Sequence, residues 1–139
     1  MLNPRIIPLL LVGTALPILG CGGTKSPEDV VKEATYASRD ADVDKLERLM
    51  APADFRALLQ AAGGDRKKLA QMMQRSQEQV QLKEVEVLST KIEGDTATVE
   101  VELVTGQGRV RAPTHLRKIR GEWRVTSPPA SGGARRGGR

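Results

Sequence analysis

The side chains with the most specific chemistry in this sequence are one cysteine, Cys21, and one histidine, His115. A thiolate is a nucleophile and a site of covalent modification, and an imidazole transfers protons near neutral pH. A zinc site takes three or four protein ligands, most of them histidine and cysteine. With a single residue of each type, we expect no metal site and no other cofactor.

Cys21 directly follows an uncharged apolar segment. Residues 1–20 hold one cation, Arg5, and the fourteen residues of segment 6–19 include Pro8 and Pro17. At a rise of about 1.5 Å per residue, this segment is too short to cross a hydrocarbon core of about 30 Å as a helix, and the prolines interrupt it further. The pattern predicts a secretory signal peptide over residues 1–20.

The end of this segment, Ile18-Leu19-Gly20-Cys21, resembles the lipobox of bacterial lipoproteins. The resemblance implies cleavage between Gly20 and Cys21, a diacylglyceryl group on the thiol, and acylation of the new amino terminus. Two or more acyl chains attach a protein stably to a membrane, whereas one alone does so marginally. Two alternatives remain open, namely a cleaved protein with a free thiol and an uncleaved anchor. In Gram-negative lipoproteins, Gly22 after the cysteine implies the outer membrane, facing the periplasm.

The distribution of charge argues against nucleic-acid binding. The formal net charge is +5, but residues 25–124 hold 18 basic and 17 acidic residues, a net of +1. Both signs are interspersed there, which is typical of an ordinary solvated surface. The chain has one tyrosine, one phenylalanine and one tryptophan, too few for a platform that stacks on bases.

The remaining cations are concentrated in a tail over residues 127–139, which is rich in Pro, Gly, Ser and Arg. This composition cannot bury apolar surface, so we expect the tail to be disordered. Two interpretations remain open: a solvated tail, or a weak and salt-sensitive contact of Arg135, Arg136 and Arg139 with anionic envelope surfaces.

Residues 22–25 form an expected tether, and the segment after it has the signals of four helices. Ser26 is a candidate N-cap with Pro27 at the first helical position, Asp65 caps the fourth helix, and Gly63-Gly64 ends the third. The expected helices cover about 26–40, 43–50, 52–60 and 66–80. Apolar residues at helical spacing predict the buried faces: Val30, Ala34, Ala37 and Ala41, then Val43, Leu46, Leu49 and Met50, then Phe55, Leu58 and Leu59, then Leu69, Met72, Met73 and Val80.

From about residue 82 the apolar period changes to two, which predicts strands at about 83–92, 96–104, 109–119 and 123–127. In the second of these, Ala97, Val99, Val101 and Leu103 are expected on the buried face. Pro113 lacks a backbone N–H and therefore indicates an edge or a bulge in the third. Helices followed by an antiparallel meander predict an α+β fold in which the helices cover the apolar face of the sheet.

Residues 26–126 resemble the NTF2-like (cystatin-like) superfamily, in particular the small DUF4878-type bacterial lipoproteins, whose domain has no known function. The likeness lies in "SPEDVVKEATYASRDADVDKLERLMAP", in the central strand hairpin and in "LRKIRGEWRV". It implies N-terminal helices packed on a curved antiparallel sheet of about four strands, forming a cone that can hold a pocket. NTF2-like domains also often pair through the sheet, so a homodimer is possible.

The sequence offers candidate pocket residues but no catalytic set. Glu84, Glu86, Glu100 and Glu102 alternate with apolar residues of the predicted strands and are therefore expected to face solvent, which leaves no desolvated general base. The candidates for lining a pocket, each with an ordinary structural role as the alternative, are Tyr36, Met72, Met73, His115 and Trp123.

We therefore expect a membrane-anchored envelope protein with a non-catalytic domain that binds a small apolar ligand or another envelope protein. The alternatives are an NTF2-like pocket enzyme of the isomerase or dehydratase type, and an unlipidated secreted protein. An enzyme of that type requires a buried ionisable side chain in a closed pocket, whereas a binding domain needs only an apolar cavity or patch.

Overall fold

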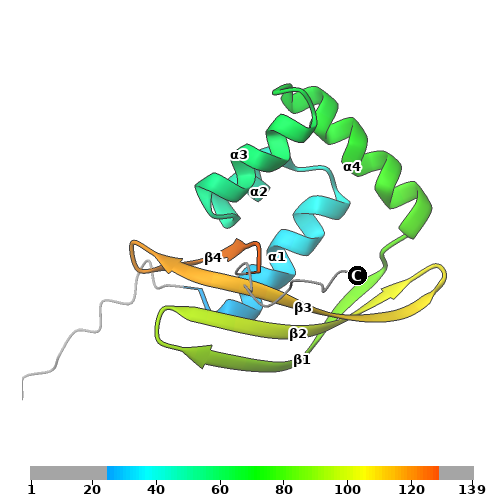
Figure 1. Ribbon diagram of the computed structural model, residues 1–139. Coiled ribbons are helices and arrows are strands. Elements are labelled where there is room, and N and C mark those ends of the chain that lie inside the picture. The colour runs from blue at the N-terminus through cyan, green and yellow to red at the C-terminus, as the bar shows by residue number, and fades with distance from the viewer. Residues whose placement is uncertain (1–24, 129–139) are drawn as a thin grey trace, which may run out of the picture.

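The computed structural model describes residues 25–128, which form four helices followed by four strands (Figure 1). The expected signal peptide, the cleavage site at Gly20 and Cys21, and the arginines of the tail lie outside the described residues. The elements are α1 (Pro27–Arg39), α2 (Val43–Leu49), α3 (Pro52–Ala61), α4 (Arg66–Val80), β1 (Glu84–Glu93), β2 (Thr96–Thr105), β3 (Gly108–Ile119) and β4 (Glu122–Thr126). The predicted α+β order is confirmed.

Local capping sets where the helices begin. The Ser26 hydroxyl accepts a hydrogen bond from the backbone amide of Asp29 at 3.2 Å, and Asp65 accepts one from the amide of Lys67 at 2.8 Å. Each cap satisfies an amide that has no partner inside its helix. α3 ends at Ala61, and Gly63-Gly64 just after it have φ angles of 75° and 79°, which are disfavoured for residues with a Cβ atom. The predicted helix starts are therefore confirmed.

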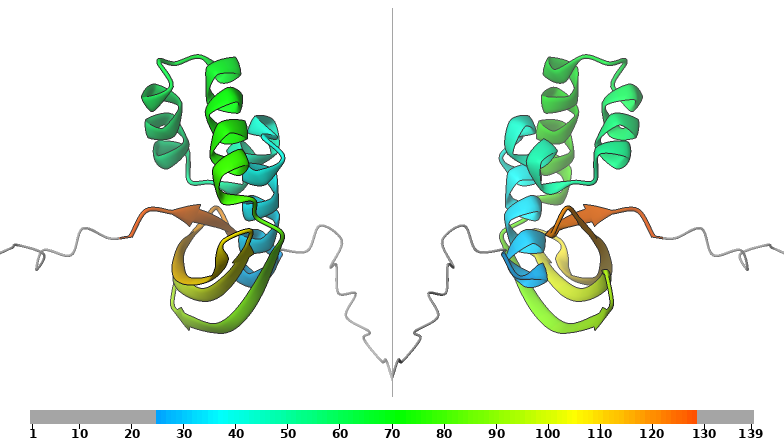
Figure 2. Two further views of the ribbon diagram at one scale, coloured as in Figure 1. Left: turned by 90° about the vertical axis from the view of Figure 1, so that its right-hand side faces the viewer. Right: turned by 90° about the vertical axis from the view of Figure 1, so that its left-hand side faces the viewer.

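The four strands form one antiparallel sheet in the order β1-β2-β3-β4. Figure 2 shows the sheet bending through an arc, with α1 beside it and with α3 and α4 standing farther away. β4 pairs only with residues 115–119 of β3, so within the described residues 25–128 the first half of β3 pairs with β2 alone and is an edge. Pro113 lies in that half, opposite Glu100 of β2, which confirms the edge that the proline predicted.

The sequence did not reveal a β-bulge in β1. The register with β2 shifts between Val87 and Ser89, so that Thr90 pairs with Val99. Leu88 is the extra residue, and its side chain is exposed. A bulge bends its strand and increases the local twist, which contributes to the curvature of this sheet.

The core lies between α1 and the concave face of the sheet. Val31 of α1, Val99 of β2 and Leu116 of β3 have almost no exposed surface. α1 contacts β1, β2 and β4, whereas α3 and α4 pack mainly against each other and against α1 and α2. The expectation that helices cover the sheet is thus met chiefly by α1.

Because α3 and α4 extend beyond the sheet, part of their predicted apolar face is not buried. The side chains of Met72 and Val80 are 44% and 40% exposed. Leu58 and Leu59 are only half-buried, and so is Ala41, which follows α1 at a positive φ of 57°. Helical spacing correctly predicted which residues share the apolar face of each helix. Which of these residues are buried depends on whether a neighbouring helix or strand covers them.

Asp54 in the first turn of α3 holds the end of β4. Its carboxylate accepts hydrogen bonds from the Thr126 hydroxyl at 2.7 Å and from the hydroxyl and backbone amide of Ser127. Ser127, the first residue of the expected tail, is therefore fastened to the domain. The hydrogen bond from the Ser127 hydroxyl, followed by that from Thr126, holds the pKa of Asp54 below its ordinary value.

Asp54→Asn is expected to lower the free energy of unfolding by about 1 kcal/mol at neutral pH. The folded-state pKa lies below the unfolded value of about 3.9, so the carboxylate stabilises the fold above that pH and loses its effect as the pH falls through the folded pKa. Urea unfolding at several pH values measures this difference between wild type and variant. Asp29→Asn, also in the first turn of a helix, controls for the helix dipole. A difference that persists unchanged at pH 2 would contradict the assignment.

Candidate functional site

A groove runs between the first half of α1, α2 and β4. Its volume is about 320 Å³, and its floor is apolar, made by Val30, Leu49 and Trp123. The charged side chains around it come from the tether, α1, α2 and β4: Lys25, Glu33, Lys45, Arg48, Glu122 and Arg124. An apolar floor beneath a charged rim is suited to a ligand with both an apolar and an ionic part.

A second hollow of about 430 Å³ adjoins the first and shares Arg48 and Arg124 with it. It lies along α2 and α3, with Phe55 and Leu59 as apolar lining and Arg56 and Glu47 as further charges. We call the two adjoining hollows the basic groove, because together they are lined by five cationic and three acidic side chains.

The carboxylates of the basic groove are all engaged in ion pairs. Glu33 lies 2.8 Å from the Lys25 ammonium and 3.9 Å from that of Lys45. Glu122 pairs with Arg124 at 3.2 Å, and Glu47 pairs with Arg66 at 2.9 Å.

Two cations of the groove have no such partner. Within residues 25–128, neither Arg48 nor Arg56 has a carboxylate oxygen within 4.0 Å. The groove therefore carries an excess of positive charge that the domain itself does not neutralise.

Trp123, the only tryptophan, is a core residue and also the floor of the basic groove. The Lys118 ammonium lies 5.1 Å from the centroid of its ring, within the range of a cation–π contact. The β3–β4 turn holds Trp123 in place: Arg120 and Gly121 both have positive φ, the conformation of a two-residue hairpin turn.

Met72 and Met73 line a different hollow, of about 280 Å³, between α1, α3 and α4. Met73 is buried, whereas Met72 lies exposed at its rim. The Gln77 side-chain amide bonds to both the N–H and the C=O of Leu82, which fixes the end of α4 against the start of the sheet. This hollow has no residue in common with the basic groove.

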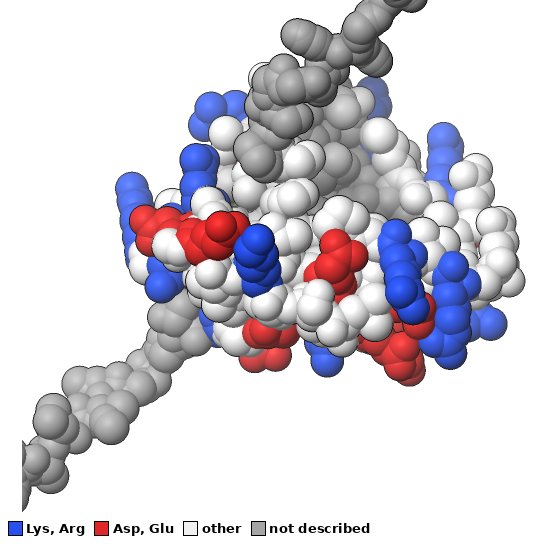
Figure 3. All heavy atoms as spheres, turned by 60° about the horizontal axis from the view of Figure 1, so that its bottom comes forward, with Lys and Arg blue, Asp and Glu red and all other residues white. Residues whose placement is uncertain are grey.

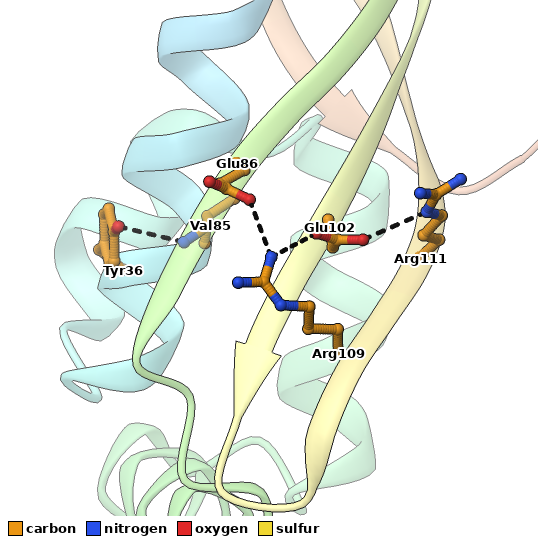
Figure 4. Close-up of polar contacts among 6 residues, drawn as sticks. All are labelled: Tyr36, Val85, Glu86, Glu102, Arg109 and Arg111. Atoms are coloured by element: carbon orange, nitrogen blue, oxygen red, sulfur yellow. Dashed lines mark hydrogen bonds and ion pairs between the residues drawn. The ribbon is translucent and has the colours of Figure 1, made fainter.

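Tyr36 and His115 line none of these hollows. The Tyr36 hydroxyl accepts a hydrogen bond from the backbone amide of Val85 at 3.3 Å and so ties α1 to β1 (Figure 4). His115 pairs across the sheet with Thr98, on the face opposite the buried residues, and its Nδ1 lies 3.4 Å from the Thr98 hydroxyl. The five candidate pocket residues therefore do not meet at one site, because they lie on both faces of the sheet and at both ends of α1.

The outer face of the sheet carries an ion-pair network. Glu102 of β2 pairs with Arg109 at 2.8 Å and with Arg111 at 3.2 Å, and Arg109 also contacts Glu86 at 3.4 Å (Figure 4). Figure 3 shows both signs of charge interspersed over this face. The Arg109 hydrogen bond, followed by that of Arg111, holds the pKa of Glu102 below its ordinary value.

The expectation that all the acidic side chains of the strands are open to solvent is wrong for Glu102. It points to the outer face as predicted, but its side chain is only 12% exposed because the two arginines cover it. The sequence did contain the signal: Glu102 and Arg111 are equally far from the turn at Gly106-Gln107, and so they pair across the hairpin.

In residues 25–128 the buried side chains are apolar, and no group of three or more possible metal ligands is present. None of the helices described has the length and apolar character needed to span a bilayer.

Comparison with known proteins identifies the fold and the family. No curated protein sequence matches the chain. A Campylobacter jejuni structure, provisionally assigned as an NTF2-like transpeptidase, is 15% identical to this chain and superposes on it with a TM-score of 0.57. The match covers 75% of this chain and 100% of the Campylobacter jejuni chain. A SEC-C motif containing protein from Rhodopseudomonas palustris is 20% identical to this chain, with a TM-score of 0.57. That match covers 73% of this chain and 76% of the Rhodopseudomonas palustris chain.

A second SEC-C motif containing protein, from Psychrobacter arcticus, is 19% identical to this chain, with a TM-score of 0.56. The match covers 91% of this chain and 76% of the Psychrobacter arcticus chain. At these identities the likeness establishes the fold, an NTF2-like arrangement of helices on a curved sheet, as the resemblance implied. The family model called "Domain of unknown function (DUF4878)" matches residues 19–126, most of the chain. The protein therefore belongs to the DUF4878 family.

Proposed function

We propose that this DUF4878 protein is anchored by lipid in the bacterial cell envelope and that its domain binds a ligand or a partner without catalysing a reaction. The observation that carries the anchor is Ile18-Leu19-Gly20-Cys21, placed at the end of an apolar segment that starts after Arg5. The span matched by the family model begins at residue 19 and so includes Gly20 and Cys21.

The surface of the domain supports the binding role. The basic groove combines an apolar floor with charged side chains that remain accessible to solvent, which suits recognition of a ligand with both characters. A general base of the isomerase type would instead need a desolvated ionisable group, and the buried residues between 25 and 128 are apolar.

Intact-mass analysis of the protein extracted from membranes tests the anchor. The expected mass is that of residues 21–139 plus a diacylglyceryl group, with or without a further acyl chain on the new amino terminus. This one measurement reports the cleavage site and the acylation together. The bare mass of residues 21–139, or that of the whole chain, would refute lipid anchoring. The Gly22 position further leads us to propose the outer membrane in a Gram-negative host, which separation of the two membranes would check.

A further inference from the structure

We propose that the basic groove binds the phosphate head groups of anionic phospholipids in the bilayer that holds the Cys21 anchor. This inference rests on the proposed lipid anchoring. It concerns a separate property of the molecule, namely which side of the domain faces the membrane and what that side recognises.

The position of the groove follows from the length of the tether. Lys25, which lines the groove, is only four residues after Cys21. Four residues of fully extended chain span at most about 14 Å. If Cys21 is embedded through its acyl chains, the mouth of the groove is therefore within reach of the head groups.

The other hollows lie farther from the anchor. α1 has 13 residues, a length of about 20 Å, and the basic groove is lined by Val30 and Glu33 in its first half. The hollow that contains the methionines is lined by Thr35, Ser38 and Arg39 in the second half. The end of the domain nearest the proposed anchor thus carries the first hollow of the basic groove, and the second hollow continues from it along α3.

The side chains of the groove suit a phosphate. Arg48 and Arg124 line both hollows, and a planar guanidinium can donate two parallel hydrogen bonds to phosphate oxygens. Arg48 and Arg56 have no carboxylate partner within the described residues, so they need not give up an ion pair to bind one. Lys25 and Lys45 share one carboxylate, Glu33, which leaves their combined charge only partly neutralised.

The apolar floor of the groove belongs to the core of the domain and does not itself enter the membrane. Trp123, Leu49 and Phe55 lie beneath the cations and are 7%, 7% and 4% exposed. A floor of low polarity strengthens the attraction between the cations above it and a bound phosphate. Attraction between the cations and an anionic surface acts over a Debye length of about 8 Å at physiological salt, so it needs the close approach that the short tether provides.

The test uses the mature lipidated protein reconstituted into two kinds of vesicle, one of phosphatidylcholine alone and one also containing phosphatidylglycerol. The amines are acetylated briefly, and the extent of modification at each lysine is measured by mass spectrometry. Lys25 and Lys45 line the groove. Lys83, an exposed lysine that directly precedes β1 and lines none of the described hollows, is the internal control. Phosphatidylglycerol is expected to reduce modification of Lys45 and Lys25 several-fold and to leave that of Lys83 unchanged. High salt is expected to remove this protection.

Variants connect the protection to the groove. The double variant Arg48→Gln/Arg56→Gln is expected to lose most of the lipid-dependent protection of Lys45. Arg75→Gln on α4, an exposed arginine outside the described hollows, removes one charge elsewhere and is expected to retain the protection. All three arginines are exposed, so the substitutions should leave the fold intact. Equal modification in both kinds of vesicle, or an equal loss in Arg75→Gln, would overturn the proposal.

Other sources of negative charge give different outcomes. Protection in phosphatidylcholine vesicles by added inorganic phosphate alone would assign the groove to a soluble phosphate and overturn the lipid assignment. Protection by an added acidic peptide, with none from phosphatidylglycerol, would assign it to an acidic protein. Flotation of the protein with neutral vesicles and its intact mass report the anchor separately, so failure of the groove and failure of the anchor are distinguishable.

Discussion

Cys21→Ser is expected to abolish acylation and remove the mature, membrane-bound form of the protein. In the proposed lipoprotein pathway the cysteine sulfur receives the diacylglyceryl group before cleavage, and a serine hydroxyl is a far weaker nucleophile than a thiolate. The signal segment should therefore stay uncleaved. Without acyl chains, each of whose buried methylenes contributes about 0.8 kcal/mol, stable attachment is lost. Labelling cells with a radioactive fatty acid, followed by fractionation and gel electrophoresis, measures acylation, cleavage and location.

Gly23→Ala is the matched control for this substitution, because it changes the same segment outside the motif 18–21. The control should be acylated and cleaved like the wild type. If Cys21→Ser fractionates with membranes at the mature size, as the wild type is expected to, the lipid anchor is ruled out. Neither cleavage nor membrane attachment would then depend on the sulfur of Cys21.

Val99→Asp is expected to unfold the domain. Val99 is fully buried at the centre of β2, where it faces α1 and the rest of the core. A carboxylate at this site would have no cation or donor to pair with, and burying an unpaired charge in an apolar core costs more than about 4 kcal/mol. That is comparable with the whole stability of a small domain, typically about 5–15 kcal/mol. Val101→Asp, two residues along the same buried face, should have the same effect.

Glu100→Gln is the control, because Glu100 is the next residue of the same strand and points to the opposite face. It keeps the shape of the side chain and is expected to change the free energy of unfolding by less than about 0.5 kcal/mol. The fluorescence of Trp123, the only tryptophan and a core residue, follows unfolding in denaturant without any label. Similar midpoints for the two variants would mean that the two faces of β2 are assigned the wrong way round.

The proposed anchor and the proposed role of the groove together imply an orientation for the domain. Only residues 22–25 separate Cys21 from Ser26, the N-cap of α1, so a lipid on Cys21 would place the start of α1 nearest the membrane. The helical hairpin of α3 and α4 extends away from the sheet (Figure 1). The hollow lined by Met72 and Met73 is carried on that hairpin and on the second half of α1.

Much of the local structure could be predicted because its causes are local. The Ser26 hydroxyl caps a helix three residues away, and Gly63-Gly64 ends one through their own φ angles. The faces of β2 followed from the alternation of valine with polar residues, since side chains of a strand point alternately to its two sides. The bulge at Leu88 left no such trace, because an extra residue is visible only against the register of the partner strand.

The candidate site could be predicted from the sequence much less well than the helices and strands. Arg48, Arg56 and Arg124 are ordinary surface cations in the sequence, and nothing near them indicates that they line adjoining hollows. His115 and Tyr36 attracted attention by their type, yet the register of the sheet places His115 on its outer face and packing ties Tyr36 to β1.

The sequence alone thus determined the Cys21 motif, the ends of the helices and the α+β order of this DUF4878 protein, because each depends on residues adjacent along the chain. The tertiary structure alone decided which charges share the basic groove, why Glu102 is covered and how much of α3 and α4 stays exposed. These features depend on strand register and on where a helix ends relative to its neighbours. Both are set by contacts between residues far apart in sequence, which no local pattern records.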